Sequence, residues 1–278
     1  MVPRRAFSRI LALVCVLSAV TLFNVPQASA SSLIRLTDRD DLFGWEAVGR
    51  VDLQGGGFCT GVLISPVLVL TAAHCVYDRA GRRVPLEGIR FHAGLRDGNP
   101  IASRKIARAA TAEEYEPLAG MSAVNIRNDA ALLELQEPIP SSIAAPFALH
   151  ERPVKGDALS VVSYGRGRAA ALSWQRNCNV LGQGQGLVAF DCNVTFGSSG
   201  APVFTDGGRR ARIVTLVVGG RKEADGKTIA YGMDLPPVVD ALKRKLRAMP
   251  KAAPSNRVNS ETAISTGRSI SGAKFAKP

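Results

Sequence analysis

The feature that most restricts the fold of this chain is a series of short apolar segments separated by turn residues. In the first half these segments lie at residues 47–53, 61–64, 67–70, 89–93 and 130–135. In the second half they lie at residues 158–164, 187–192, 201–204, 213–218 and 228–233. Short segments of this kind, broken by glycine and proline, are typical of antiparallel strands. The 27 glycines and 16 prolines agree with an all-β fold.

A proline-spaced connector at residues 138–146 divides these segments into two similar sets. We therefore expect two packed antiparallel β-barrels, at about residues 45–137 and 147–235. A helix is expected over residues 237–249, because Pro237 can open a helix and apolar residues then recur at helical spacing until Pro250. These apolar residues are Val238, Val239, Leu242, Leu246 and Met249.

The first 30 residues have the pattern of a secretory signal peptide. Basic residues precede an apolar run at 10–20, and Ala28 and Ala30 supply the small residues of a cleavage site. The run is short for a membrane span of about 20 residues. We expect export to the periplasm or the medium, cleavage after Ala30, a mature domain over 31–249, and no transmembrane segment after cleavage.

The net charge of +12 is concentrated near the C-terminus. Residues 243–278 carry nine Lys or Arg and one Glu, whereas the mature body at 31–242 has a net charge of about +1. Low apolar content predicts that residues 250–278 form a disordered basic tail. Because the body is nearly neutral, we expect no nucleic-acid partner, and we expect a monomer.

Four cysteines remain after signal cleavage, and an even number in an exported chain indicates disulfides. They are Cys59, Cys75, Cys178 and Cys192, which allow three pairings. The sequence shows no metal-ligand cluster, so neither a metal nor another cofactor is expected.

Three motifs carry residues suited to nucleophilic catalysis. His74 lies in TAAHC at 71–75, after an apolar strand, and Asp129 leads into the apolar strand of NDAALLEL at 128–135. An aspartate in such a place can hold an imidazole in one tautomer. Ser199 lies in GSSGAPV at 197–203, where glycines permit a tight turn whose N–H groups can hold a negatively charged oxygen.

In this order the motifs resemble those of the trypsin-like (chymotrypsin-fold) serine proteases, which carry TAAHC, a D-[IA]-A-L-L strand and GDSGGP. GSSGAP is nearer to the GNSGSP of the bacterial glutamyl-endopeptidase-like branch. The resemblance covers about residues 45–242 and implies an active site between the barrels. His74 would be the general base, Asp129 its orienting partner and Ser199 the nucleophile. The N–H groups of Gly197 and Ser199 would form the oxyanion hole.

The chain departs from the family in two places. Ser198 replaces the aspartate of GDSGGP, and no Ile-Val-Gly-Gly start occurs at 31–45, so activation by an ammonium–aspartate bond is not expected. Asn193 lies at the position of the pocket floor, six residues before Ser199, and Val217 lies near the histidine position of the glutamyl-specific enzymes. With Val194 and Val218, these residues predict a mostly apolar substrate pocket.

We expect the disulfides Cys59–Cys75 and Cys178–Cys192. Both close short loops, and the first also matches the family. The second pair flanks a glycine-rich hairpin at 182–186 and would brace the loop that carries Ser199.

The sequence thus predicts a secreted serine endopeptidase that hydrolyses peptide bonds of proteins or peptides through an acyl-enzyme intermediate. One alternative is an inert protease homologue that acts as a secreted binding protein. In that reading the basic tail would provide a binding surface for anionic polymers or membranes.

Overall fold

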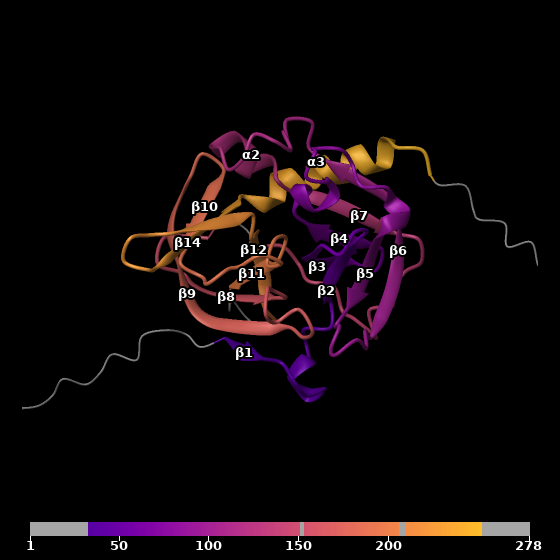
Figure 1. Ribbon diagram of the computed structural model, residues 1–278, viewed down its shortest axis with the longest axis horizontal. Coiled ribbons are helices and arrows are strands. Elements are labelled where there is room, and N and C mark those ends of the chain that lie inside the picture. Colours follow the sequence, from indigo (N-terminus) through magenta and orange to yellow (C-terminus); the bar gives the residue numbers. More distant parts are fainter. Residues whose placement is uncertain (1–32, 151–152, 206–209, 252–278) are drawn as a thin grey trace, which may run out of the picture.

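The two halves of the molecule lie side by side in the computed structural model, which describes residues 33–150, 153–205 and 210–251 (Figure 1). The predicted signal peptide, and the predicted tail beyond residue 251, lie outside the described residues. The first half is a closed antiparallel barrel with the strand order β2-β3-β4-β7-β6-β5. Its strands are β2 (Val48–Leu53), β3 (Phe58–Ser65), β4 (Leu68–Thr71), β5 (Ile89–Ala93), β6 (Ala102–Thr111) and β7 (Ala131–Leu135).

The barrel closes around branched apolar side chains that the sequence places on its strands. Val62, Leu70 and Leu132 are fully buried and come from three neighbouring strands. Gly49 and Gly61 pair across β2 and β3, and a Cβ at Gly49 would overlap the Phe91 ring. The two glycines therefore leave room for core side chains where β2 and β3 pair.

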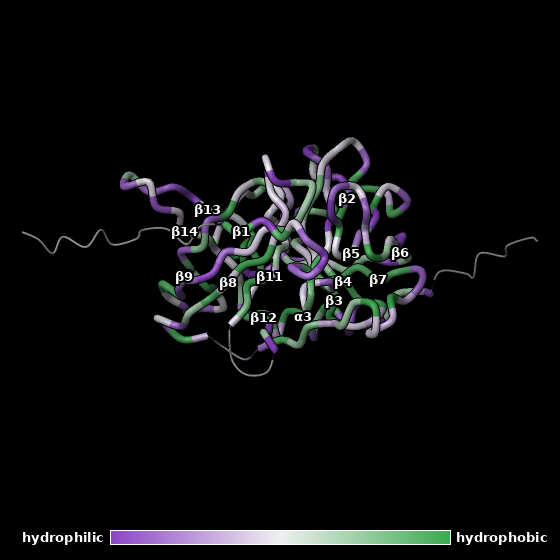
Figure 2. Tube along the Cα trace, turned by 90° about the horizontal axis from the view of Figure 1, so that it is seen from below, coloured by the Kyte–Doolittle hydropathy of each residue, from purple (hydrophilic) through white to green (hydrophobic). Residues whose placement is uncertain are grey.

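The second half is a curled antiparallel sheet with the order β12-β11-β8-β9-β10-β14-β13, to which β1 adds by pairing with β9. Its strands are β1 (Ile34–Arg35), β8 (Ala158–Ser163), β9 (Ser173–Gly184), β10 (Leu187–Phe190), β11 (Pro202–Thr205), β12 (Arg212–Leu216), β13 (Gly219–Lys222) and β14 (Thr228–Met233). The β13–β14 hairpin projects from the body and is largely hydrophilic (Figure 2).

The predicted all-β fold is confirmed, but the second half is not a fully closed barrel. Its edge strands β12 and β13 are separated along the chain only by Val217 and Val218. These two residues bond elsewhere: the Val217 amide and carbonyl bond to the segment around Ser199, and the Val218 N–H donates to the Tyr231 carbonyl. The sheet opens here because this backbone joins the loop that carries Ser199.

Aromatic side chains join the two halves. Trp45, which precedes β2, packs against three aromatic rings, with centroids 5.1–5.8 Å apart. These are Phe147, which directly follows the connector, Trp174 of β9 and Phe204 of β11. Aromatic pairs at such separations add stability beyond the area that they bury. The cluster fixes the orientation of the halves, and hence of the cleft between them.

The predicted C-terminal helix is present as α3 (Leu235–Ala248), so it begins two residues before the expected start. It crosses from the second half to the first and contacts β12, β6 and β7 (Figure 1). Within the described ranges, no helix combines the length and the apolar character needed to cross a membrane. A short helix that was not expected, α2 (Ala123–Asn128), precedes β7.

Candidate active site

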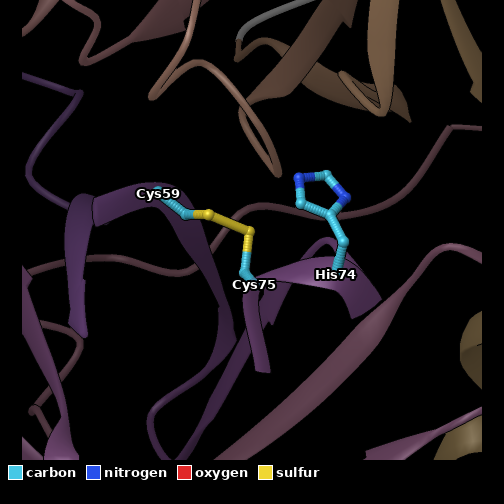
Figure 3. A group of neighbouring side chains, drawn as sticks. All are labelled: Cys59, His74 and Cys75. Atoms are coloured by element: carbon cyan, nitrogen blue, oxygen red, sulfur yellow. A yellow bond between two sulfur atoms is a disulfide. The ribbon is translucent and has the colours of Figure 1, made fainter. Parts of the chain in front are cut away.

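His74 lies on a single turn of 3₁₀ helix, η2 (Ala73–Val76), directly after β4. The preceding alanines are fully buried, so their small side chains let this turn pack against the barrel. The disulfide Cys59–Cys75, which confirms the predicted pairing, links the turn to β3. Figure 3 shows the disulfide beside the His74 ring, which projects away from the first barrel toward the second half.

Asp129 contacts His74 through both of its carboxylate oxygens. His74 Nδ1 lies 2.7 Å from Asp129 Oδ2, and the His74 backbone N–H donates to Asp129 Oδ1 at 2.9 Å. The Asp129 side chain is only 7% exposed, whereas that of His74 is 33% exposed. This arrangement fixes the ring and places the proton on Nδ1, which leaves Nε2 free to accept a proton.

The helix α2 positions Asp129 at its C-terminal end. Ser122 caps the start of α2, where its Oγ accepts from the Asn125 N–H at 3.1 Å. The buried Asn125 side chain bonds to the backbone of Glu116 and Gly120 and holds the preceding loop closed. Serine is a preferred residue at the start of a helix, so Ser122 is the one sequence signal that could have pointed to α2.

Ser199 lies in a turn that only glycine can flank. Gly197 has φ +92° and Gly200 has φ +74°. A Cβ at Gly197 would lie 2.7 Å from Phe58 Cζ, and a Cβ at Gly200 would lie 2.7 Å from the Ala72 nitrogen. The glycines therefore supply both the left-handed backbone and the close approach that this turn requires.

Thr60 of β3 ties this turn to the first barrel, a role that the sequence did not indicate. Its backbone N–H donates to the Ser199 carbonyl at 2.9 Å, and its Oγ1 donates to the Gly197 carbonyl at 2.8 Å. The same Oγ1 accepts from the Tyr164 N–H at 3.0 Å. A single fully buried hydroxyl thus fixes the turn relative to both halves.

The predicted oxyanion-hole donors are available in this turn. Within the described ranges, the N–H groups of Gly197 and Ser199 donate to no protein acceptor, whereas those of Ser198 and Gly200 do. Two free amides of this kind in one turn, on either side of Ser198, can bind a developing oxyanion.

A cleft of about 1010 Å³ between the two halves brings most of the predicted residues together. His74, Asp129, Gly197 and Ser199 line it, as do Val194, Val217 and Val218. Within the part of the chain described, no hydrogen bond joins the Ser199 hydroxyl to His74. Such bonds are often long before a substrate is bound.

Asn193 does not line this cleft. Its side chain is exposed, its backbone N–H donates to Gln175 Oε1 at 2.6 Å, and its Oδ1 accepts from Thr228 Oγ1. The backbone bond turns Asn193 toward β9, so Val194 is the first residue of this segment to reach the cleft. The structure therefore places Asn193 outside the predicted substrate pocket.

Three aromatic residues of the cleft, Phe58, Tyr115 and Phe196, were not identified from the sequence. Phe58 lies beneath Gly197, and Tyr115 lies on the His74–Asp129 side of the cleft. Burial, followed by the charges of Asp129 and Tyr77, raises the pKa of Tyr115. Its phenol therefore stays neutral beside the Asp129 carboxylate.

The sulfur atoms of Cys59 and Cys75 and a ring nitrogen of His74 lie within 4.8 Å of one another. This group does not form a metal site, because disulfide sulfurs are not thiolates and only the imidazole remains as a strong ligand.

The second predicted disulfide is also present. Cys178 of β9 is bonded to Cys192, which follows β10. Cys192 is fully buried and lies seven residues before Ser199, so the bridge anchors the start of the segment that carries Ser199.

The fold and the cleft define a β protein of two packed halves, with a serine, a histidine and an aspartate gathered between them. Residues 59–211 match the trypsin-like peptidase domain. The chain belongs to this family, which confirms the resemblance seen in its motifs.

Individual relatives agree with this assignment. Serine protease SP24D of Anopheles gambiae is 34% identical over 163 residues, which are 52% of this chain and 57% of that protein. Glutamyl endopeptidase of Bacillus licheniformis is 26% identical over 157 residues, which are 55% of this chain and 47% of that protein. The chain thus spans about half the length of the curated relatives that it matches.

Solved structures share the fold at low sequence identity. A Glu endopeptidase in complex with MPD aligns with a TM-score of 0.64 at 18% identity, covering 80% of this chain and 99% of that chain. The protease Anisep of Arthrobacter nicotinovorans aligns with a TM-score of 0.59 at 16% identity, covering 73% and 96%.

Proposed function

We propose that this protein is a secreted serine endopeptidase that cleaves peptide bonds through His74, Asp129 and Ser199. The observation that carries the proposal is the double contact of Asp129 with His74, in a cleft that Ser199 also lines. Membership of the trypsin-like peptidase family supports it.

In the proposed mechanism, His74 Nε2 removes the proton from Ser199 Oγ as this oxygen attacks the carbonyl carbon of the scissile bond. The negative oxygen of the tetrahedral intermediate accepts from the N–H groups of Gly197 and Ser199. His74 then gives the proton to the leaving amine, and the acyl group remains on Ser199. Water, deprotonated by His74, hydrolyses the ester and regenerates the hydroxyl.

The test is the variant Ser199→Ala, measured on a peptide ester and with an organophosphate that labels active serines. We expect kcat to fall by about 10⁴-fold or more and labelling to be lost, with the melting temperature retained. Ser160→Ala is a matched control, because Ser160 is a buried serine of β8 whose Oγ has no partner in the described structure. Wild-type turnover by Ser199→Ala would contradict the proposal.

For the substrate, we propose a preference for an apolar side chain before the cleaved bond. Val194, Val217 and Val218 form an apolar part of the cleft, and a Cβ at Gly220 would lie 3.0 Å from Val194. Asp129, already bonded to His74, is the one carboxylate among the described residues that line the cleft. A buried cation on the substrate would therefore find no partner there.

A set of peptide substrates that differ only at this position tests the preference. We expect kcat/KM to be at least about 10-fold higher for Leu or Phe than for Lys or Arg, the scale of discrimination that an apolar pocket provides. The set should also include a substrate with Glu at this position, because one relative of this chain is a glutamyl endopeptidase. Faster cleavage after Glu would overturn the apolar preference and leave the endopeptidase proposal intact.

Export is the other part of the proposal. The signal-peptide pattern of residues 1–30 supports it, as do the two disulfides, which form and persist in oxidising compartments. N-terminal sequencing of protein recovered outside the cytoplasm should begin at Ser31. Recovery only from the cytoplasm, with Met1 retained, would contradict export.

A further inference from the structure

Ser198 lies between the two candidate oxyanion-hole residues, and its side chain points away from the solvent. It is fully buried, and its Oγ donates to the Tyr164 carbonyl at 3.2 Å. The same Oγ accepts from Arg168 Nη2 at 3.0 Å and lies 3.3 Å from Ser163 Oγ. The orientation of the Ser198 side chain is therefore set by a polar network behind the turn.

Arg168 supplies the charge of this network. Its Nη1 donates to the Ser163 carbonyl at 2.6 Å, and its Nη2 donates to Ser163 Oγ at 3.0 Å as well as to Ser198. Within the described ranges, no carboxylate forms an ion pair with this guanidinium. Burial alone lowers the pKa of Arg168 to about 10.

An arginine of this kind is costly for the fold, because a partly buried charge without a counter-ion loses some of its solvation, and neutral acceptors replace that loss only in part. An apolar side chain of similar volume would fill the same space at less cost. The position of Arg168 behind the turn therefore points to a role in the site rather than to stability.

Gly165 completes the connection between Arg168 and the turn. A Cβ at Gly165 would lie 2.8 Å from the guanidinium carbon of Arg168, and a Cβ at Gly197 would lie 3.2 Å from Gly165 Cα. The backbone of Gly165 therefore lies between the guanidinium and Gly197. A shift of Arg168 would move both Gly165 and Ser198.

We propose that Arg168 is a positioning residue, whose partly buried guanidinium holds Ser198 and thereby keeps the N–H groups of Gly197 and Ser199 directed at the substrate oxyanion. This inference rests on the proposed function. The charge of Arg168, partly shielded from water, also favours the negative charge that develops on the oxyanion.

The first experiment compares Arg168→Met, Arg168→Lys and the wild-type protein on one peptide ester. We expect Arg168→Met to lower kcat by about 10–100-fold, the effect of a small misplacement of catalytic groups, with KM changed by less than about 3-fold. Arg168→Lys, which keeps the positive charge, should have a kcat between those of Arg168→Met and the wild type. Arg104→Met is the control, because Arg104 of β6 bonds to backbone carbonyls outside the cleft. It should retain the wild-type kcat.

The second experiment introduces a carboxylate at Ser198. Ser198→Asp should retain activity when Arg168 is present, because the carboxylate would pair with the guanidinium. The double variant Ser198→Asp/Arg168→Met should lose far more activity than the two single effects combined, because its buried carboxylate has no partner. Simple addition of the two effects would overturn the inference. If Arg168→Met does not fold, Ser198→Ala removes the bond from Arg168 together with the other contacts of the Ser198 hydroxyl, and it should lower kcat with KM retained.

The outcomes separate this inference from the proposed function. An active wild type with an equally active Arg168→Met overturns the inference alone. A wild type that neither turns over the ester nor reacts with the organophosphate overturns the proposed function. The amide resonance of Gly197 in ¹⁵N-glycine-labelled protein then tests the inference separately. It should shift in Arg168→Met and not in Arg104→Met, and an unmoved resonance in both would overturn the inference.

Discussion

Asp129 binds His74 with one carboxylate oxygen on the ring nitrogen Nδ1 and the other on the backbone N–H, at 2.7 Å and 2.9 Å. The two residues are 55 positions apart in the chain. One oxygen fixes the ring, and the other fixes the turn that carries it. The carboxylate is therefore a positional restraint as well as an electrostatic partner.

Asp129→Asn should lower kcat on a peptide ester by about 10⁴-fold near neutral pH. The new amide group can donate to Nδ1, which would place the ring proton on Nε2 and remove the acceptor that Ser199 needs. The melting temperature should change little. Asp157→Asn is the control, because Asp157 accepts a backbone N–H at a surface turn and the amide oxygen can still do so. Turnover by Asp129→Asn within 10-fold of wild type would contradict this role.

Gly197→Ala should damage both stability and catalysis. The residue has φ +92°, and its new Cβ would overlap the Phe58 ring. We expect a loss of about 1–3 kcal/mol in the free energy of unfolding from backbone strain, plus the cost of the overlap. Alanine keeps the backbone N–H, but the strain and the overlap should displace it from the oxyanion and lower kcat by about 10²-fold or more. Gly98→Ala, with φ +81° and open space around the Cβ, should show the strain alone and retain kcat.

Removal of the disulfide Cys178–Cys192 should lower the free energy of unfolding by about 3 kcal/mol, because the closed loop has a sequence separation of 14. The double variant Cys178→Ala/Cys192→Ala avoids free thiols, and urea unfolding measures the change. An unchanged midpoint of unfolding would show that β9 and β10 hold this hairpin without the bridge.

His92 should make the fold less stable in acid. Burial, only partly opposed by Asp52, lowers the pKa of His92, and its Nδ1 is buried without a partner in the described structure. The unfolded chain then binds a proton that the folded chain does not. The free energy of unfolding should therefore fall as the pH drops below about 6.5, which is the ordinary pKa of histidine. The fall should continue until the pH reaches the lowered pKa of His92 in the folded protein.

Unfolding measured at several pH values between 8 and 5 tests this effect. His92→Gln should flatten the decline, because glutamine takes up no proton in this range. An equal slope in the wild type and in His92→Gln would contradict the contribution of His92.

Arg108→Met should destabilise the attachment of α3. Arg108 bonds to Glu134 of β7, and its Nη1 also donates to the Leu246 and Met249 carbonyls at 2.9 Å and 2.7 Å, at the end of α3. Its loss leaves Glu134 and these carbonyls unpaired, so we expect about 2–4 kcal/mol less stability by chemical unfolding. Lys245→Met, which breaks the exposed pair with Glu113, should cost less than about 1 kcal/mol. An equal loss of stability in Arg108→Met and Lys245→Met would contradict the proposed role of Arg108 in attaching α3.

Local pattern was enough to predict the parts of this protein that depend on short stretches of chain. Alternating turn and apolar segments predicted the all-β fold, and Pro237 with the apolar repeat predicted α3, because strand and helix periodicity are properties of neighbouring residues. Both disulfides close short loops, so spacing and family resemblance predicted their pairing correctly. The motifs around His74 and Ser199 also predicted the family.

Only the tertiary structure decided the arrangement around these motifs. Thr60 and Gly197 bond across 137 positions, and Arg168 and Ser198 across 30, with no motif that relates either pair. The second sheet stays open because the backbone of Val217 bonds to the segment around Ser199. The exposure of Asn193 likewise depends on a bond between distant segments, from its backbone N–H to Gln175. Such contacts leave no periodic trace in the sequence, because they form only after separate strands have packed and closed the cleft.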